Sequence, residues 1–90
     1  MSTDVKGYLM LRKKVIIDNV YGLHMRPALK IALACLGMES KVLIMNGLKK
    51  ASCFSILEML LLEAKFGSEV EIVAEGIDEA LAMETVSGFF

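Results

Sequence analysis

Apolar and polar residues alternate in short segments along the chain, which is the pattern of strands that bury one face. The segments are 11–18, 40–45, 48–53 and 69–75. In the first segment, Val15 and Ile17 share a face. In the last, we expect Val70, Ile72 and Ala74 to point inward and the glutamates to point outward. The Asn46-Gly47 dipeptide between the middle two segments favours a β-hairpin turn.

Three other segments have the apolar spacing of helices. They are 27–36, 55–65 and the stretch from 76 to the end. Ser55 is placed to cap the second helix, with Glu58 three residues on as in a capping box. Gly37 and Gly67 follow the first two helices as stop signals, and Asp78 opens the third.

The predicted order is strand, helix, strand, strand, helix, strand, helix. Ninety residues form one domain with a modest core. Strands joined through one hairpin and through helices indicate an α+β sandwich, in which a single sheet carries its helices on one face.

Composition narrows the class of protein further. Apolar residues make up 56% of the chain, but the longest run, 59–62, is far too short to span a bilayer, and the N-terminus shows no secretory signal. Cys35 and Cys53 lack metal-like or redox-motif spacing, so we interpret them as reduced apolar residues of a cytoplasmic protein. No membrane insertion is expected.

Charge is divided unevenly along the chain. Residues 1–50 hold nine Lys and Arg against three Asp and Glu, whereas residues 51–90 hold one Lys against eight Asp and Glu. The basic half would attract anions or acidic partners, although solvated faces that happen to segregate are an equal alternative. Nucleic acid is a weaker candidate, because no basic stripe with interleaved aromatic residues is present.

The stretch YGLHMRP, residues 21–27, carries the candidate chemistry, because it contains the chain's single histidine and single proline. His24 falls at a predicted helix start, where unpaired backbone N–H groups favour an anion. Arg26 offers a planar fork suited to phosphate oxygens, and Pro27 fits a first helical turn. Gly22 permits backbone angles that are closed to other residues.

A neutral imidazole in this setting can accept a phosphoryl group as a nucleophile. The plainer alternative, an ordinary exposed histidine at a helix start, is the commoner one on physical grounds alone. A metal site is poorly supported, since no cysteine or carboxylate cluster is near His24. Because no nucleotide-binding glycine loop occurs, a phosphoryl donor would have to be another protein.

The motif GLHMRPA resembles the phosphorylation site of HPr, the histidine-containing phosphocarrier of the bacterial sugar phosphotransferase system, and the similarity runs from about Met10 to the C-terminus. The resemblance implies a four-stranded antiparallel sheet with three helices on one face. It implies that His24 takes phosphate on Nδ1 from enzyme I and passes it to IIA domains of sugar permeases. Arg26 would stabilise the phosphoryl group, while Gly22, Leu23 and Pro27 shape the loop and helix start. Such a protein acts as a stoichiometric, monomeric carrier without a cofactor.

The resemblance also marks Ser55 as a candidate for regulatory phosphorylation by an HPr kinase/phosphorylase, which would prepare a complex with a transcriptional regulator. Phe54 stands where a lysine commonly precedes that serine, which weakens the case for kinase recognition. Helix capping is the plain alternative role for Ser55, and the two roles can coexist.

The second helix is more apolar than a half-exposed helix requires, so we expect Ile56, Leu57 and Leu60 to form an exposed partner surface beside His24. Leu33 and Leu36 likewise occupy positions that often carry lysines or polar residues in the family. These departures leave the recipients open: sugar permeases, a nitrogen-type regulatory phosphotransfer chain, or a binding role for serine-phosphorylated protein with His24 idle.

The first nine residues lie before the region of resemblance. They show no period and little apolar content, so we expect residues 1–9 to be a mobile extension, with Met10 as an alternative start.

Overall fold

The computed structural model describes residues 10–90, and the prediction for residues 1–9 lies outside them. Seven elements follow one another in the predicted order. They are β1 (Leu11–Ile16), α1 (Met25–Cys35), β2 (Lys41–Asn46), β3 (Lys49–Ser52), α2 (Ile56–Leu61), β4 (Glu69–Glu75) and α3 (Glu79–Ser87). The predicted βαββαβα, α+β organisation is confirmed.

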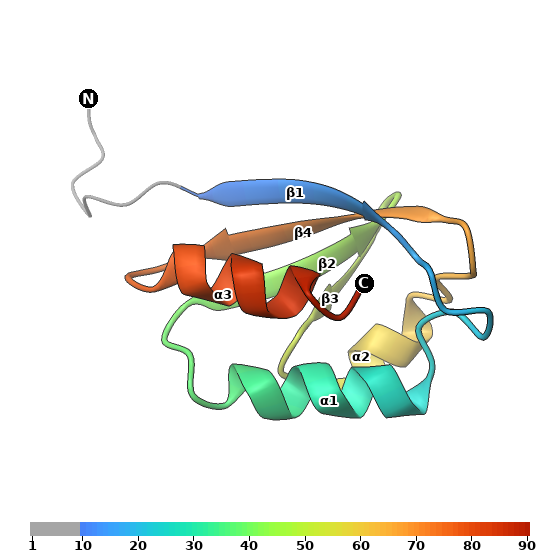
Figure 1. The fold of residues 1–90 in the computed structure, drawn as a ribbon, viewed down its shortest axis with the longest axis horizontal. Helices are drawn as coiled ribbons and strands as arrows, with labels where there is room; N and C mark the ends of the chain where they lie inside the picture. Colours follow the sequence, from blue (N-terminus) through green and yellow to red (C-terminus); the bar gives the residue numbers. More distant parts are fainter. Residues whose placement is uncertain (1–9) are drawn as a thin grey trace.

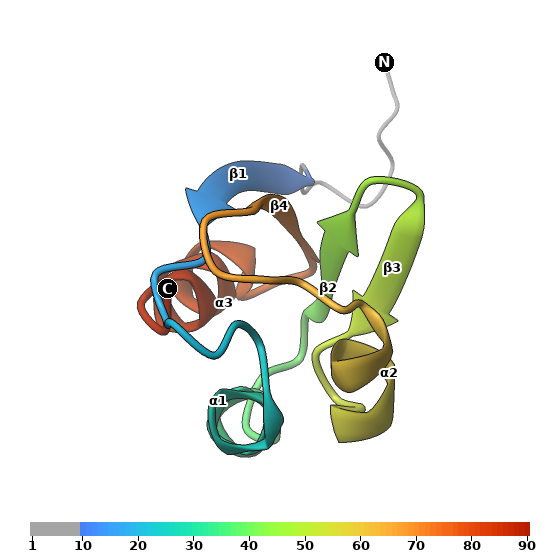
Figure 2. The ribbon, with the colours of Figure 1, turned by 90° about the vertical axis from the view of Figure 1, so that its right-hand side faces the viewer.

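The four strands form one antiparallel sheet in the order β1-β4-β2-β3. All three helices lie on the same side of this sheet, and its other side is left open (Figures 1 and 2). The Asn46-Gly47 turn joins β2 to β3, and Gly47 has a φ of +62°, a conformation that suits glycine. The open-faced sandwich expected from the sequence is therefore present.

The core lies between the sheet and the helices. Alternate residues of β4 point into it as predicted, and Val70, Ile72 and Ala74 are buried. Helix α1 contributes one buried side, which consists of Ala28, Ile31, Ala32 and Cys35.

Cys35 and Cys53 are free and buried, as predicted for reduced apolar residues. The hydrogen bond that the Cys53 thiol makes to Cys35, together with burial, raises the pKa of Cys53, so this thiol stays protonated. No helix within residues 10–90 is long and apolar enough to cross a membrane.

Several boundaries differ from the prediction. Strand β1 ends at Ile16 instead of residue 18, and α3 covers Glu79–Ser87 instead of the whole stretch from 76 to the end. Helix α1 begins at Met25 instead of Pro27, so Pro27 lies inside the first turn. Helix α2 ends at Leu61 instead of residue 65, because Glu63 adopts a left-handed φ of +54°. Asn46 Nδ2 donates to the carbonyl of Leu62 at 3.0 Å, which turns the chain away from the helix. Gly67 therefore does not end α2, although it also has a positive φ.

Asp78 marks the start of α3 as predicted, but its side chain does not cap that helix. Its carboxylate accepts hydrogen bonds from the backbone N–H groups of Glu39 and Ser40, each at 2.9 Å, and from the Ser40 hydroxyl. These bonds, with the Ser40 hydroxyl as the largest cause, lower the pKa of Asp78. The carboxylate thus ties the loop before β2 to the start of α3.

Candidate functional site

The loop from β1 to α1 is built on a tight turn that begins at Asn19. The Oδ1 atom of Asn19 accepts a hydrogen bond from the backbone N–H of Tyr21 at 2.9 Å, and its carbonyl accepts one from Gly22 at 2.8 Å. This is the usual role of asparagine at a turn. The turn fixes the direction in which the chain approaches α1.

Gly22 and Leu23, at the end of this turn, anchor the loop to the segment that follows α2. The N–H of Leu23 donates to the carbonyl of Ala64 at 2.9 Å, and the Leu23 side chain is buried in the core. Gly22 has a φ of +72°, and a Cβ atom placed there would lie 2.5 Å from the Ala64 carbonyl oxygen. Only glycine satisfies both the backbone angle and this close approach.

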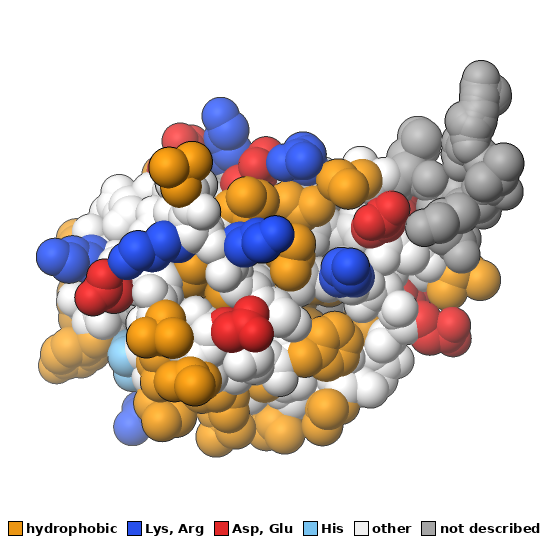
Figure 3. Space-filling model, turned by 180° about the vertical axis from the view of Figure 1, so that it is seen from behind, with side chains coloured by type: hydrophobic (Ala, Val, Ile, Leu, Met, Phe, Trp, Pro, Cys, Tyr) orange, Lys and Arg blue, Asp and Glu red, His pale blue; other side chains and the backbone are white. Residues whose placement is uncertain are grey.

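His24 comes immediately after this anchor and occupies the N-cap position of α1. Its backbone is extended, with φ −104° and ψ −170°, and its side chain makes no capping hydrogen bond. His24 is half-buried, and Figure 3 shows the histidine side chain, in pale blue, at one end of the molecule beside a gathering of hydrophobic side chains. The ring is therefore available to an approaching molecule.

Two residues that sequence reasoning missed hold the imidazole. Asn19 Nδ2 lies 3.4 Å from His24 Nε2, and the Tyr21 ring meets the imidazole edge-on with centroids 5.8 Å apart. Because Asn19 Oδ1 is engaged by Tyr21 N–H, its amide nitrogen is the atom that faces Nε2. These contacts occupy one ring nitrogen and leave Nδ1 as the nitrogen without a hydrogen-bond partner within residues 10–90.

The first turn of α1 offers several groups that suit an anion. The opening N–H groups of a helix lack intrahelical partners and carry the positive end of its dipole. The turn contains no acidic residue, Pro27 lies within it, and Arg26 is exposed. Among residues 10–90, Arg26 forms no salt bridge, so its guanidinium is free to meet an anion bound near His24.

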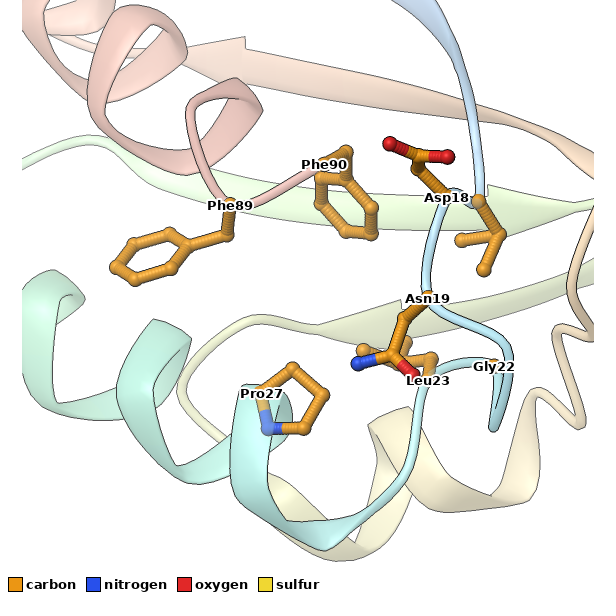
Figure 4. Close-up of a pocket in the computed structure, with 8 residues that line it drawn as sticks. Asp18, Asn19, Gly22, Leu23, Pro27, Phe89 and Phe90 are labelled. Atoms are coloured by element: carbon orange, nitrogen blue, oxygen red, sulfur yellow. The ribbon is translucent and has the colours of Figure 1, made fainter.

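A pocket of about 240 Å³ lies beside this loop. Figure 4 shows Pro27 and Asn19 on one side of it and Phe89 and Phe90, after α3, on the other. His24 does not line the pocket. We therefore interpret the pocket as the contact region in which the residues after α3 support the loop, and not as a reaction site.

Ser55, the other candidate site, is the N-cap of α2. Its Oγ accepts a hydrogen bond from the Glu58 N–H at 3.1 Å, as the predicted cap requires. The Glu58 carboxylate does not return to Ser55, as a complete capping box would, but accepts from the Ser52 N–H at 2.9 Å. Ser55 is half-buried.

The predicted apolar surface of α2 differs from the expectation. Leu57 is exposed, but Ile56 and Leu60 are partly buried and pack against the core, because the short helix turns that side inward. Leu61 is the second exposed leucine of α2. Within residues 10–90 no cluster of three or more metal-ligating side chains occurs.

An open-faced sandwich that presents a single histidine at a helix start, beside an arginine and above unpaired N–H groups, has the architecture of a histidine phosphocarrier. Comparison with known proteins makes the assignment specific. Residues 11–90 match the family model described as the PTS HPr component phosphorylation site, and the chain belongs to this family of phosphocarriers of the phosphotransferase system.

Individual relatives agree with the family. The chain is 34% identical over 76 residues to the phosphocarrier protein NPr of Shewanella violacea, with 84% of each chain covered. It is 33% identical over 81 residues to the phosphocarrier protein HPr of Treponema pallidum, covering 90% of this chain and 92% of that protein. Its fold matches the crystal structure of HPr from Bacillus anthracis with a TM-score of 0.84 and 26% identity, over 91% of this chain and 98% of that one.

Proposed function

We propose that this chain accepts a phosphoryl group on Nδ1 of His24 from phosphorylated enzyme I and passes it to IIA domains of sugar permeases. Members of the family are phosphocarriers and not catalysts, and the proposed role is stoichiometric transfer by a monomeric cytoplasmic protein. The observation that carries the proposal is the position of His24 at the N-cap of α1, where its side chain makes no capping hydrogen bond and its Nδ1 has no partner within residues 10–90.

The arrangement gives each neighbouring residue a role. Nδ1 of His24 attacks the phosphorus while the bond between phosphorus and the phosphorylated residue of enzyme I breaks. The oxygens of the transferred phosphoryl group then face the first turn of α1. Arg26 reaches them with a bidentate fork, which stabilises charge during the transfer. Gly22, Leu23 and Pro27 keep the loop and helix start in place, and Asn19 orients the ring.

The experiment is incubation with enzyme I and phosphoenolpyruvate, followed by mapping of acid-labile phosphate. The chain should take up one phosphate at His24. His24→Ala should abolish uptake and keep the fold, and equal uptake by this variant would refute the assignment. Arg26→Ala should slow transfer, and Arg26→Lys should restore little of the rate, because a point charge lacks the fork.

A second candidate is a carrier role in a nitrogen-type regulatory phosphotransfer chain, with the same chemistry and different recipients. The observation that favours it is the set of relatives named phosphocarrier protein NPr, from Shewanella violacea and from Proteus mirabilis, each 34% identical. Transfer rates from the phosphorylated chain to IIA domains of the two kinds, measured in parallel, distinguish the candidates.

Regulation through Ser55 is also part of the proposal. A phosphate on its Oγ would add about two negative charges beside the surface that enzyme I approaches. Such a form would suit a complex with a transcriptional regulator. Incubation with an HPr kinase/phosphorylase tests whether Phe54 before the serine is tolerated.

A further inference from the structure

The amide of Asn19 faces the imidazole in a fixed orientation. Its Oδ1 accepts the N–H of Tyr21 at 2.9 Å, so its Nδ2 is the atom that lies 3.4 Å from His24 Nε2. The Tyr21 ring meets the imidazole edge-on, at an interplanar angle of 82°. Figure 4 shows the Asn19 side chain extending from the loop toward the start of α1, where Pro27 lies. Tyr21 therefore holds the amide with its backbone and the imidazole with its side chain.

This contact determines which ring nitrogen carries a proton. The Nδ2 group of an asparagine only donates hydrogen bonds, so Nε2 of His24 must accept. A neutral imidazole has one N–H group and one acceptor nitrogen, so the proton is then on Nδ1. Within residues 10–90 no charged side chain bonds to the ring and imposes the other tautomer. The neutral, unphosphorylated ring is therefore in its Nδ1–H form.

The tautomer that Asn19 favours is not the one that attacks phosphorus. Attack requires a lone pair on Nδ1, so the proton must first move, through water, from Nδ1 to Nε2. In that form the Nε2–H and the Asn19 N–H groups point at each other, and the hydrogen bond is lost. Because Asn19 is exposed, this bond is modest and lowers the population of the attacking form by about two- to tenfold.

The same contact favours the ring once it is phosphorylated. A bond from phosphorus to Nδ1 forms while the bond to the donor breaks, and the product ring is a cation with a proton on Nε2. Loss of that proton to water gives a neutral phosphohistidine, whose Nε2 lone pair accepts the N–H of Asn19. For phosphorus to leave the ring again, Nε2 must first regain a proton, so that the imidazole departs as a neutral group and not as an anion. An N–H donor held at Nε2 opposes this protonation.

We propose that Asn19 is a positioning residue that prolongs the lifetime of the phosphorylated carrier by keeping Nε2 of the phosphohistidine unprotonated. This inference rests on the proposed function, because it concerns the phosphorylated form of His24. The hydrogen bond from Asn19 slows both hydrolysis and uncatalysed loss of the phosphoryl group. The group is thereby retained between encounters with protein partners.

The test is Asn19→Asp, which keeps the turn and inverts the ring contact. One carboxylate oxygen can still accept the Tyr21 N–H, while the other accepts the Nε2–H that Asn19 opposes. Both chains are labelled with phosphoramidate, a small chemical donor, and the loss of acid-labile phosphate is followed at about pH 7.5. The half-life of the phosphate in Asn19→Asp should be shorter by about threefold or more. Half-lives that agree within about 1.5-fold would overturn the proposal.

Two further variants separate the ring contact from charge and from the turn. Val20→Asp adds the same charge at the neighbouring position, which is 70% exposed, and should keep the native half-life. Asn19→Ser retains an oxygen that can form the turn but no amide donor, and its half-life should fall between those of the native chain and Asn19→Asp. An equally short half-life in Val20→Asp would mean that charge alone acts, which contradicts the proposal. Circular dichroism confirms that every variant is folded.

Nitrogen-15 NMR of the unphosphorylated imidazole detects the tautomer, which a purely structural role of Asn19 would not set. Measured on the neutral ring in alkaline buffer, the native chain should carry its proton on Nδ1 and Asn19→Asp on Nε2. A native ring with its proton on Nε2 would defeat this inference and leave the proposed function standing. A chain with the expected tautomer and lifetimes that phosphorylated enzyme I never labels would defeat the proposed function alone.

Discussion

Replacement of Gly22 by alanine tests how the site is held in place. The added Cβ would lie 2.5 Å from the Ala64 carbonyl oxygen and 3.2 Å from the Lys65 Cα, and both are backbone atoms. Gly47 provides a matched control, because its φ of +62° is close to the +72° of Gly22 but no atom lies within 4 Å of its Cβ position. The two substitutions therefore share the cost of the backbone angle and differ in the clash.

The magnitudes follow from these two contributions. An alanine in the left-handed region costs about 1–2 kcal/mol, which is the whole effect expected for Gly47→Ala. In Gly22→Ala the chain must also move away from Ala64 and lose the Leu23 N–H bond to its carbonyl, which leaves a buried donor unpaired at a further cost of about 1–3 kcal/mol. Gly22→Ala should thus destabilise the fold by about 2–5 kcal/mol.

Thermal or guanidinium unfolding followed by circular dichroism measures the difference. For a domain of this size, each kcal/mol corresponds to roughly 4–8 °C in Tm, so Gly22→Ala should melt well below Gly47→Ala. Transfer from enzyme I should fall in Gly22→Ala, measured where it is still folded, and should be unchanged in Gly47→Ala. Equal destabilisation by the two changes, within about 0.5 kcal/mol, would refute the argument that close approach to Ala64 requires glycine.

Three other predictions follow from the described contacts. Ser55→Asp should weaken transfer from enzyme I by like-charge repulsion and keep α2, since aspartate also caps; unchanged kinetics at low salt would favour a plain cap. Because the pKa of Asp78 is lowered in the fold, its stabilising contribution is complete at pH values above its ordinary pKa and is lost as the pH falls through the lowered pKa. Asp78→Asn should therefore reduce the free energy of unfolding at neutral pH. Denaturant unfolding measured from about pH 2 to pH 7 should also show a smaller loss of stability toward acid in the variant. A chain shortened to begin at Met10 should keep its Tm within about 2 °C and its transfer rate, and a large loss in either would show that residues 1–9 contribute.

Much of the fold could be predicted because local signals agreed with the tertiary arrangement. The alternation in β4 predicted its buried face, and Asn46-Gly47 predicted the hairpin. The cap at Ser55 predicted where α2 begins. Each of these signals depends on residues close together in sequence, and no distant contact opposes them.

The end of α2 could not be predicted in this way. Residues 62–65 have helix-favouring side chains, so helix propensity alone predicts that α2 continues through them. Distant contacts end it: Asn46 binds the Leu62 carbonyl, and Lys49 Nζ lies 2.7 Å from Glu63 Oε1. That hydrogen bond from Lys49 lowers the pKa of Glu63. Both partners come from the β2–β3 hairpin, which sequence reasoning had no basis to place beside α2.

The candidate site was predictable only where the residue types themselves carry the signal, and not where a distant contact decides the geometry. The residue types at Gly22, His24 and Arg26 indicate their chemistry without any distant partner. Asn19 and Tyr21 could be assigned only to a turn, because their contacts with the imidazole depend on the three-dimensional course of the loop. An asparagine three residues before the glycine is a sequence signal for the turn, but it does not indicate the ring contact.

The residues that follow α2 also hold the loop between β1 and α1. The end of α2 and the position of the candidate site are therefore connected. Glu63 takes a backbone angle that costs a non-glycine residue about 1–2 kcal/mol. That angle turns the chain so that the carbonyl of Ala64, the next residue, meets the N–H of Leu23 beside Gly22. The unfavourable conformation is thus retained where it positions the backbone just before His24. Strain after α2 and order at the candidate site are two consequences of one contact between segments about forty residues apart.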